Sequence, residues 1–220
     1  MRKFMESGFY VIYLVLMIGI GLILIRRGKE KKPLKYFGLA CVILGCGDAF
    51  HLIPRAVGLF TGTLDAPGAA LAAWLGIGKL ITSITMTVYY LLMYFFVFAR
   101  RGLARNRALD IAVCALVIVR IALCAFPQND WVHNASVLSW GIIRNVPFVI
   151  LGVLFIVLAY AHLRKTRPYR LLWLAVTLSF AFYLPVVLFA AEAGWVGMMM
   201  LPKTLCYLWI LFMGQKDSHL

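Results

Sequence analysis

The stretch LLWLAVTLSFAFYLPVVLFAA, residues 171–191, decides the fold class because it runs for 21 residues without a charged side chain. A helix rises about 1.5 Å per residue, so this run gives a rod of about 31 Å, close to the roughly 30 Å hydrocarbon core of a bilayer. Six further apolar runs lie at about residues 9–25, 36–57, 69–99, 109–126, 136–163 and 197–214. The pattern predicts an all-α polytopic membrane protein with seven transmembrane helices in one domain, residues 1–220.

The composition supports the same class. Hydrophobic residues make up 64% of the chain, charged residues only 14%, and the mean hydropathy is +0.92. A soluble domain is roughly half apolar and about a quarter charged, so this class is excluded. The apolar runs are continuous and lack the alternation of a membrane-spanning strand, which favours helices over a β-barrel.

The positive charge of the chain follows its predicted topology. The formal net charge is +14, and three loops hold six, four and four cations, at residues 26–35, 100–107 and 164–170. The alternate loops hold no Lys or Arg, at residues 58–68, 127–135 and 192–196. Because Lys and Arg accumulate on the cytoplasmic side, we predict that the N-terminus is outside and the C-terminus cytoplasmic. We expect a bacterial plasma membrane location, and the charge requires no nucleic-acid partner.

Eight ionisable residues interrupt the apolar runs or lie at their ends: Asp48, His51, Arg55, Lys79, Arg120, Arg144, Glu192 and Lys203. Charges within a bilayer are costly and usually face the interior of a helix bundle or a water-filled cavity. Converted to depth along each helix, these residues share the outer half of the bundle. We therefore predict one water-accessible cavity that opens to the outside.

The second predicted helix carries the densest part of this set. Asp48, His51 and Arg55 follow the spacing i, i+3 and i+7, which places them on one helix face. We assign Asp48 and His51 as candidate catalytic residues. The candidate ligand-binding residues are Arg55, Lys79, Ser83, Tyr90, Arg120, Trp140, Arg144, Asn145, Tyr183, Glu192, Lys203 and Tyr207.

The signs of these charges indicate the chemistry of the ligand. Five are permanent cations, whereas Asp48 and Glu192 are the only acids expected within the helices, which leaves three cations unpaired. Such an excess in a low dielectric requires water or an anion, so we predict a ligand with a phosphate or carboxylate, either a lipid headgroup or a small soluble anion. The alternative is a set of ion pairs that only fixes helix packing.

Metal and cofactor motifs are absent from the sequence. The five cysteines form no CxxC pair, and the four histidines form no HxxxH pair. Zinc sites in proteins normally require such clusters of His, Cys, Asp or Glu. We therefore predict neither a metal nor a cofactor.

The segment Gly47-Asp48-Ala49-Phe50-His51-Leu52-Ile53-Pro54-Arg55 resembles the Gly-Asp helix of the lysoplasmalogenase family, and Lys32-Pro33 resembles a Lys-Pro pair that this family carries upstream. The resemblance implies a polytopic hydrolase that cleaves the vinyl-ether bond of lysoplasmalogens, with Asp48 as its catalytic acid. Lys203, in the last of seven predicted helices, also resembles the retinal lysine of opsins, although Lys79 lies in the third helix, where many opsins carry an acid.

Two functional classes remain open at this point. In an intramembrane lipid hydrolase, Asp48 would act as general acid or base, His51 would shuttle the proton, and cations would hold the headgroup and stabilise negative charge. In a transporter or a receptor-like sensor, the same cavity would bind an anion or a lipid without turnover. The partner in either class is a membrane lipid or a small anion.

Overall fold

The computed structural model describes residues 2–29, 31–64, 66–189 and 193–218. Its helices are α1 (Arg2–Arg27), α2 (Lys32–Thr61), α3 (Ala69–Arg101), α4 (Arg107–Ala125), η1 (Pro127–Asn129), α5 (Leu138–Leu163), η2 (Tyr169–Leu171), α6 (Leu172–Phe189), η3 (Gly194–Met199) and α7 (Met200–Asp217). Among the described residues, seven helices are long and apolar enough to cross a membrane. The predicted class, an all-α integral membrane protein, is confirmed.

The helix boundaries differ from the prediction mainly at the N-terminus. α1 begins at Arg2 and not at residue 9, because Glu6 and Ser7 are buried within the bundle and not exposed in a polar tail. α2 and α3 are followed by the cap residues Gly62 and Gly102, which adopt φ angles of 71° and 61°. This left-handed conformation suits glycine and stops a helix.

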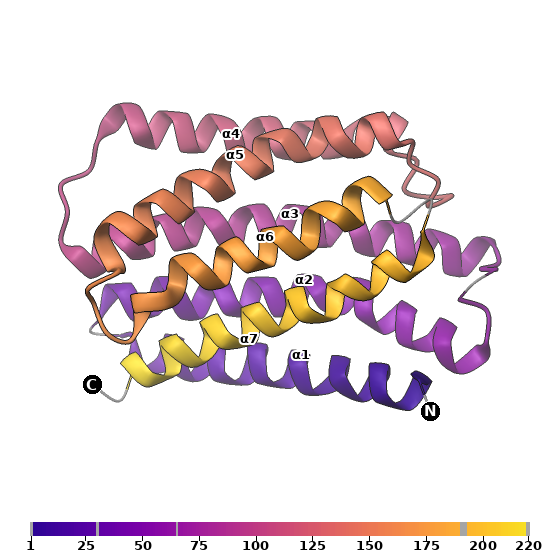
Figure 1. Cartoon of the computed structure of the whole chain (residues 1–220), viewed down its shortest axis with the longest axis horizontal. Coiled ribbons are helices and arrows are strands. Elements are labelled where there is room, and N and C mark those ends of the chain that lie inside the picture. Colours follow the sequence, from indigo (N-terminus) through magenta and orange to yellow (C-terminus); the bar gives the residue numbers. More distant parts are fainter. Residues whose placement is uncertain (1, 30, 65, 190–192, 219–220) are drawn as a thin grey trace.

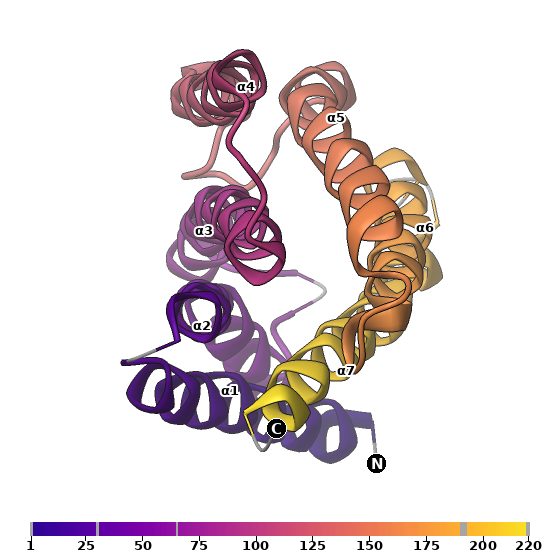
Figure 2. The same ribbon diagram turned by 90° about the vertical axis from the view of Figure 1, so that its left-hand side faces the viewer.

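Successive helices run antiparallel, and the chain travels back and forth along the bundle (Figure 1). Viewed end-on, α1 to α4 stack in one column and α5 to α7 form a second (Figure 2). The columns join where α4 packs on α5 and where α7 returns to α1. The cation-rich connections after α1, α3 and α5 lie at the same end of the bundle as the C-terminus (Figure 1).

An aromatic cluster fills the space between the two columns. Tyr90 lies at its centre, with ring centroids 5.4 Å from Phe148, 5.8 Å from Phe155 and 5.7 Å from Phe180. These rings come from α3, α5 and α6 and are all buried. The outer surface is also apolar, as expected for helices that face acyl chains. The cluster fixes the position of the cavities described next, because Phe148 also forms part of a cavity wall.

Candidate functional site

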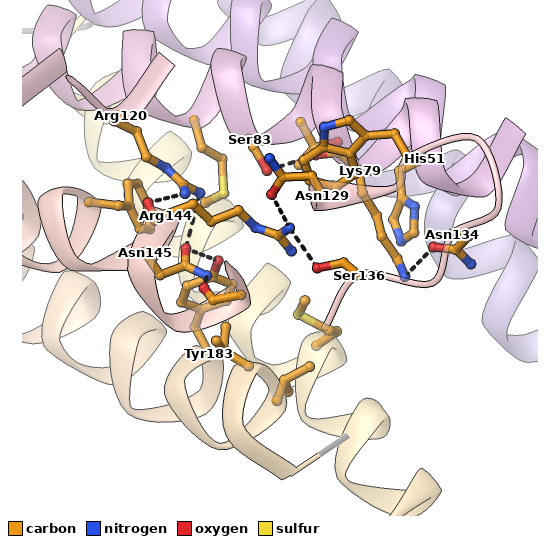
Figure 3. Close-up of a pocket in the computed structure, with 18 of the residues that line it drawn as sticks. His51, Lys79, Ser83, Arg120, Asn129, Asn134, Ser136, Arg144, Asn145 and Tyr183 are labelled. Carbon is orange, nitrogen blue, oxygen red and sulfur yellow. Dashed lines mark hydrogen bonds between the residues drawn. The ribbon is translucent and has the colours of Figure 1, made fainter. Parts of the chain in front are cut away.

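A cavity of about 290 Å³, lined by charged and polar side chains among apolar ones, lies at the end of the bundle that holds the α4–α5 connection (Figure 3). Four cations from four different helices line it: Lys79, Arg120, Arg144 and Lys203. No Asp or Glu of the described residues contributes to its wall. We refer to it as the cationic cavity.

Arg144 reaches into the cationic cavity from α5 and is held by neutral groups. Its guanidinium donates to Asn129 Oδ1 at 2.7 Å and to Ser136 Oγ at 3.0 Å. It also lies 4.5 Å from the centre of the Trp131 ring, in cation–π contact. These contacts orient the side chain but leave its charge without a counter-ion among the residues that the structure describes.

Arg120 of α4 is only 2% exposed and lies deeper in the same wall. It donates to the backbone carbonyl of Arg144, and its Nη2 donates to Asn145 Oδ1 at 3.0 Å. Tyr183 donates to the same Asn145 oxygen at 2.7 Å, so the three side chains link α4, α5 and α6. Arg120 therefore both contributes charge and positions the segment that carries Arg144.

Lys79 has a neutral partner, and Lys203 has neutral neighbours together with one electrostatic partner, the Asp48 carboxylate, which lies beyond ion-pair distance. Lys79 Nζ donates to Asn134 Oδ1 at 2.7 Å, at the exposed side of the cavity (Figure 3). Lys203 is 8% exposed, and its Nζ lies 3.6 Å from Met86 Sδ and 4.8 Å from the centre of the Tyr183 ring. A thioether and an aromatic face are weak partners for an ammonium group.

Other cations of the bundle have acidic partners, unlike the four cations of the cationic cavity. Arg55 pairs with Glu6 at 2.9 Å, and Arg100 pairs with Asp217 at 2.7 Å. Across the described part of the chain, no carboxylate lies within the 4.0 Å ion-pair distance of any cation of the cationic cavity. Burying an ion without a counter-charge costs several kcal/mol, and this penalty applies to the buried Arg120 and Lys203, whereas Arg144 is partly exposed and Lys79 is exposed.

The α4–α5 connection is fixed tightly over the cavity. Asn129 is fully buried, and its Nδ2 donates to the carbonyls of Leu123 and Phe126, each at 2.8 Å. Gly76 of α3 packs directly beneath this connection, since a Cβ at this position would lie 1.7 Å from the carbonyl oxygen of Trp131. Only glycine allows this close approach.

A second cavity of about 760 Å³ lies between α1, α2 and the start of α7. We refer to it as the α1–α7 cavity. Asp48 and Arg55 line it, where Tyr13 donates to Asp48 Oδ2 at 2.6 Å and Arg55 pairs with Glu6. Four residues line both cavities, which therefore adjoin each other: His51, Thr82, Met200 and Lys203.

Most of the predicted site residues line one or both cavities, and three described ones line neither. In the cationic cavity lie His51, Lys79, Ser83, Arg120, Arg144, Asn145, Tyr183 and Lys203. In the α1–α7 cavity lie Asp48, His51, Arg55 and Lys203, so the face predicted from the spacing on α2 does line one cavity. Tyr90 and Tyr207 lie in the buried core with their hydroxyls 3.2 Å apart, and Trp140 stacks on Phe126. Glu192 lies outside the described residues.

The charge inventory made from the sequence needs one correction. Asp48 is not the only acid within the described helices, because α1 includes Glu6, which pairs with Arg55, and Asp110 and Asp217 lie in α4 and α7. The spacing of Glu6, Tyr10 and Tyr13, one helical turn apart, is the signal that could have revealed this polar stripe on α1. The loop residues Asn129, Asn134 and Ser136 are not among the predicted site residues, because no local sequence pattern shows how the α4–α5 connection folds over the cavity.

Neither a metal site among the described residues nor a similarity to a known protein indicates the function. The described residues contain no group of three or more His, Cys, Asp or Glu that could hold a metal ion. No protein-family model, curated protein or solved structure matches the chain. The function must therefore be inferred from the site itself.

Proposed function

We propose that this integral membrane protein binds a phosphate- or carboxylate-bearing ligand in the cationic cavity. One observation carries the proposal: four cations line a cavity whose described wall contains no acid. Guanidinium and ammonium groups form charge-assisted hydrogen bonds with such oxyanions. Binding is the step that a transporter, a receptor-like sensor and an enzyme would share.

The proposal includes an orientation. The cation-rich loops and the C-terminus share one end of the bundle, which supports a cytoplasmic location for that end (Figure 1). The cationic cavity lies toward the opposite end and would open to the outside. In a bacterium this arrangement would place the site in the plasma membrane, facing ligands that arrive from the exterior or from the outer leaflet.

Isothermal titration of the purified protein with glycerol 3-phosphate, inorganic phosphate and acetate tests the proposal. Arg144→Gln removes one charged donor, and a hydrogen bond to a charged group contributes about 1.5–3 kcal/mol. Since about 1.4 kcal/mol is a factor of ten, we expect a loss of affinity of about tenfold to a hundredfold. The matched control is Arg101→Gln, a substitution at an exposed position in the last turn of α3. This variant should bind the anions normally. An absence of binding by every anion would refute the proposal.

A lipid hydrolase is the second candidate function, and the geometry of Asp48 and His51 favours it. Both residues line the α1–α7 cavity, and Nδ1 of His51 is buried without a hydrogen-bond partner among the described residues. Unsatisfied buried groups of this kind occur at catalytic sites. In this role Asp48 or His51 would activate a water against a lipid bond, as the lysoplasmalogenase resemblance implies.

Mass spectrometry of lipids incubated with the purified protein tests the hydrolase. Turnover by the wild-type protein that Asp48→Asn abolishes would establish it, whereas unchanged lipids with both proteins would exclude it. Anion binding in the cationic cavity would stand in either case, because Asp48 does not line that cavity.

A further inference from the structure

The α1–α7 cavity has exposed apolar residues in its wall. α1 and α7 meet near the C-terminal end, where Arg27 Nη1 donates to Ser218 Oγ at 3.1 Å, and they diverge toward the other end (Figure 1). The cavity occupies this divergence, since both helices supply its walls. Its rim residues Met5, Met198 and Leu205 are 70%, 53% and 52% exposed. An exposed apolar rim on the flank of a membrane-spanning bundle faces acyl chains.

The interior of this cavity is suited to an alkyl chain. Three of its polar residues are already paired, because Glu6 pairs with Arg55 and Asp48 accepts a hydrogen bond from Tyr13, whereas His51 and Lys203 lie at the boundary with the cationic cavity. Most of the remaining wall is apolar: Met5, Phe9, Leu52, Met198, Met200, Leu201 and Leu205. The volume of about 760 Å³ lies within the range of about 300–1,000 Å³ typical of ligand sites.

The two cavities share a boundary. Met200 and Lys203 form part of this boundary, and both carry unbranched side chains that can change rotamer. On one side of Lys203 lie the unpaired cations, and on the other lies the apolar opening to the membrane. A molecule that spans the boundary would place a charged group and an apolar group in adjoining compartments.

We propose that the two cavities form one site for a single-chain amphiphile whose head is a phosphate monoester or a carboxylate. The head lies in the cationic cavity, and the alkyl chain lies in the α1–α7 cavity and leaves between α1 and α7. This proposal rests on the anion binding proposed above and specifies its ligand class. A choline headgroup is disfavoured, because its ammonium would enter a cavity that already holds four cations and no described acid.

A scintillation proximity assay with tritiated 1-oleoyl lysophosphatidate, on the full-length protein in nanodiscs, tests the proposal. The competitors are oleate, 1-oleoyl lysophosphatidylcholine and glycerol 3-phosphate. We expect lysophosphatidate or oleate to compete at concentrations at least tenfold lower than the other two. The better of these two competitors identifies the head as phosphate or carboxylate.

Two variants test the α1–α7 cavity and the cationic cavity separately. Leu205→Trp narrows the opening at an exposed position and should weaken lysophosphatidate binding at least tenfold, while glycerol 3-phosphate binds as before. Arg144→Gln should weaken both ligands. Equal binding of glycerol 3-phosphate and lysophosphatidate, with no effect of Leu205→Trp, would overturn the proposal of an amphiphilic ligand. This result would not contradict the proposal that the cationic cavity binds an anion. Competition by lysophosphatidylcholine at the same concentration would also overturn it. Failure of all anions to bind would refute both proposals.

Discussion

Lys203→Met removes a buried positive charge while keeping an unbranched side chain. Lys203 is 8% exposed, and its ammonium has a sulfur at 3.6 Å and two tyrosine rings at 4.8 and 5.8 Å as neighbours. The burial penalty of an ion is several kcal/mol even after relaxation. Each ring offsets about 0.5–2 kcal/mol of this penalty. The Asp48 carboxylate attracts Lys203 from beyond ion-pair distance and offsets a further part of the penalty. These partial offsets leave the charge with little net contribution to stability in the absence of a ligand.

The expected result separates stability from binding. Replacement of buried ions by apolar residues of similar volume is neutral or stabilising by about 1–4 kcal/mol. We expect the free energy of unfolding of the ligand-free Lys203→Met protein to stay level or to rise within this range. We expect its affinity for glycerol 3-phosphate to fall by about tenfold to a hundredfold. Unfolding is measured by SDS titration in detergent micelles after exhaustive exchange of bound ligand, and affinity is measured by calorimetry.

The matched control is Arg100→Met, which removes a cation that has a partner. Arg100 lies 2.7 Å from Asp217, and loss of this pair leaves a carboxylate that is only 11% exposed. We expect the free energy of unfolding to fall by about 1–3 kcal/mol, without a change in anion affinity. If Lys203→Met destabilises the ligand-free protein as much as Arg100→Met does, then the protein itself neutralises Lys203 and the reasoning is refuted.

Three further predictions concern the loop, the packing and the orientation. Ser136→Asp places a carboxylate beside Arg144 and should lower anion affinity at least about tenfold, by calorimetry, because the cation is then neutralised internally. Gly76→Ala should displace the carbonyl of Trp131 and the connection over the cavity, and it should lower anion affinity by a similar factor. A cysteine at Thr63 in a cysteine-free protein should react with a membrane-impermeant maleimide in intact cells.

Each of these variants has a matched control. Ser139→Asp lies at an exposed position on α5 that does not line the cationic cavity, and Gly19→Ala adds a methyl where no atom lies within 4 Å. Both should bind anions normally. Lys29→Cys should react with the maleimide only after the cells are permeabilised. Reaction of Lys29→Cys, and not of Thr63→Cys, in intact cells would show the opposite orientation.

Local sequence patterns could predict the fold class and part of the site. An apolar run of about 20 residues determines a membrane-spanning helix almost by itself, so the number of helices followed from hydropathy. The face of α2 that carries Asp48, His51 and Arg55 followed from helical periodicity in the same way, because neighbours on one helix are fixed by the backbone. These residues do line one cavity.

Contacts between distant segments could not be predicted from local patterns. Tyr207 follows Lys203 by one turn, yet it points into the core toward Tyr90, because the position of α3 decides which turn of α7 meets the cavity. The start of α1 at Arg2 could not be predicted, because it depends on the contact between Glu6 and Arg55. These two residues lie 49 positions apart in the sequence. The loop side chains that hold the cations depended on how the α4–α5 connection folds over α3.

Native mass spectrometry of the protein released directly from nanodiscs made with bacterial membrane lipid tests most directly whether the unpaired cations bind an anion. The wild-type protein should carry one adduct, whose fragmentation yields a phosphate or a carboxylate. The double variant Arg144→Gln, Lys203→Met should lose this adduct, whereas Arg101→Gln should keep it. A wild-type protein that appears only at its bare mass would contradict the proposed function, as would an adduct that the double variant retains.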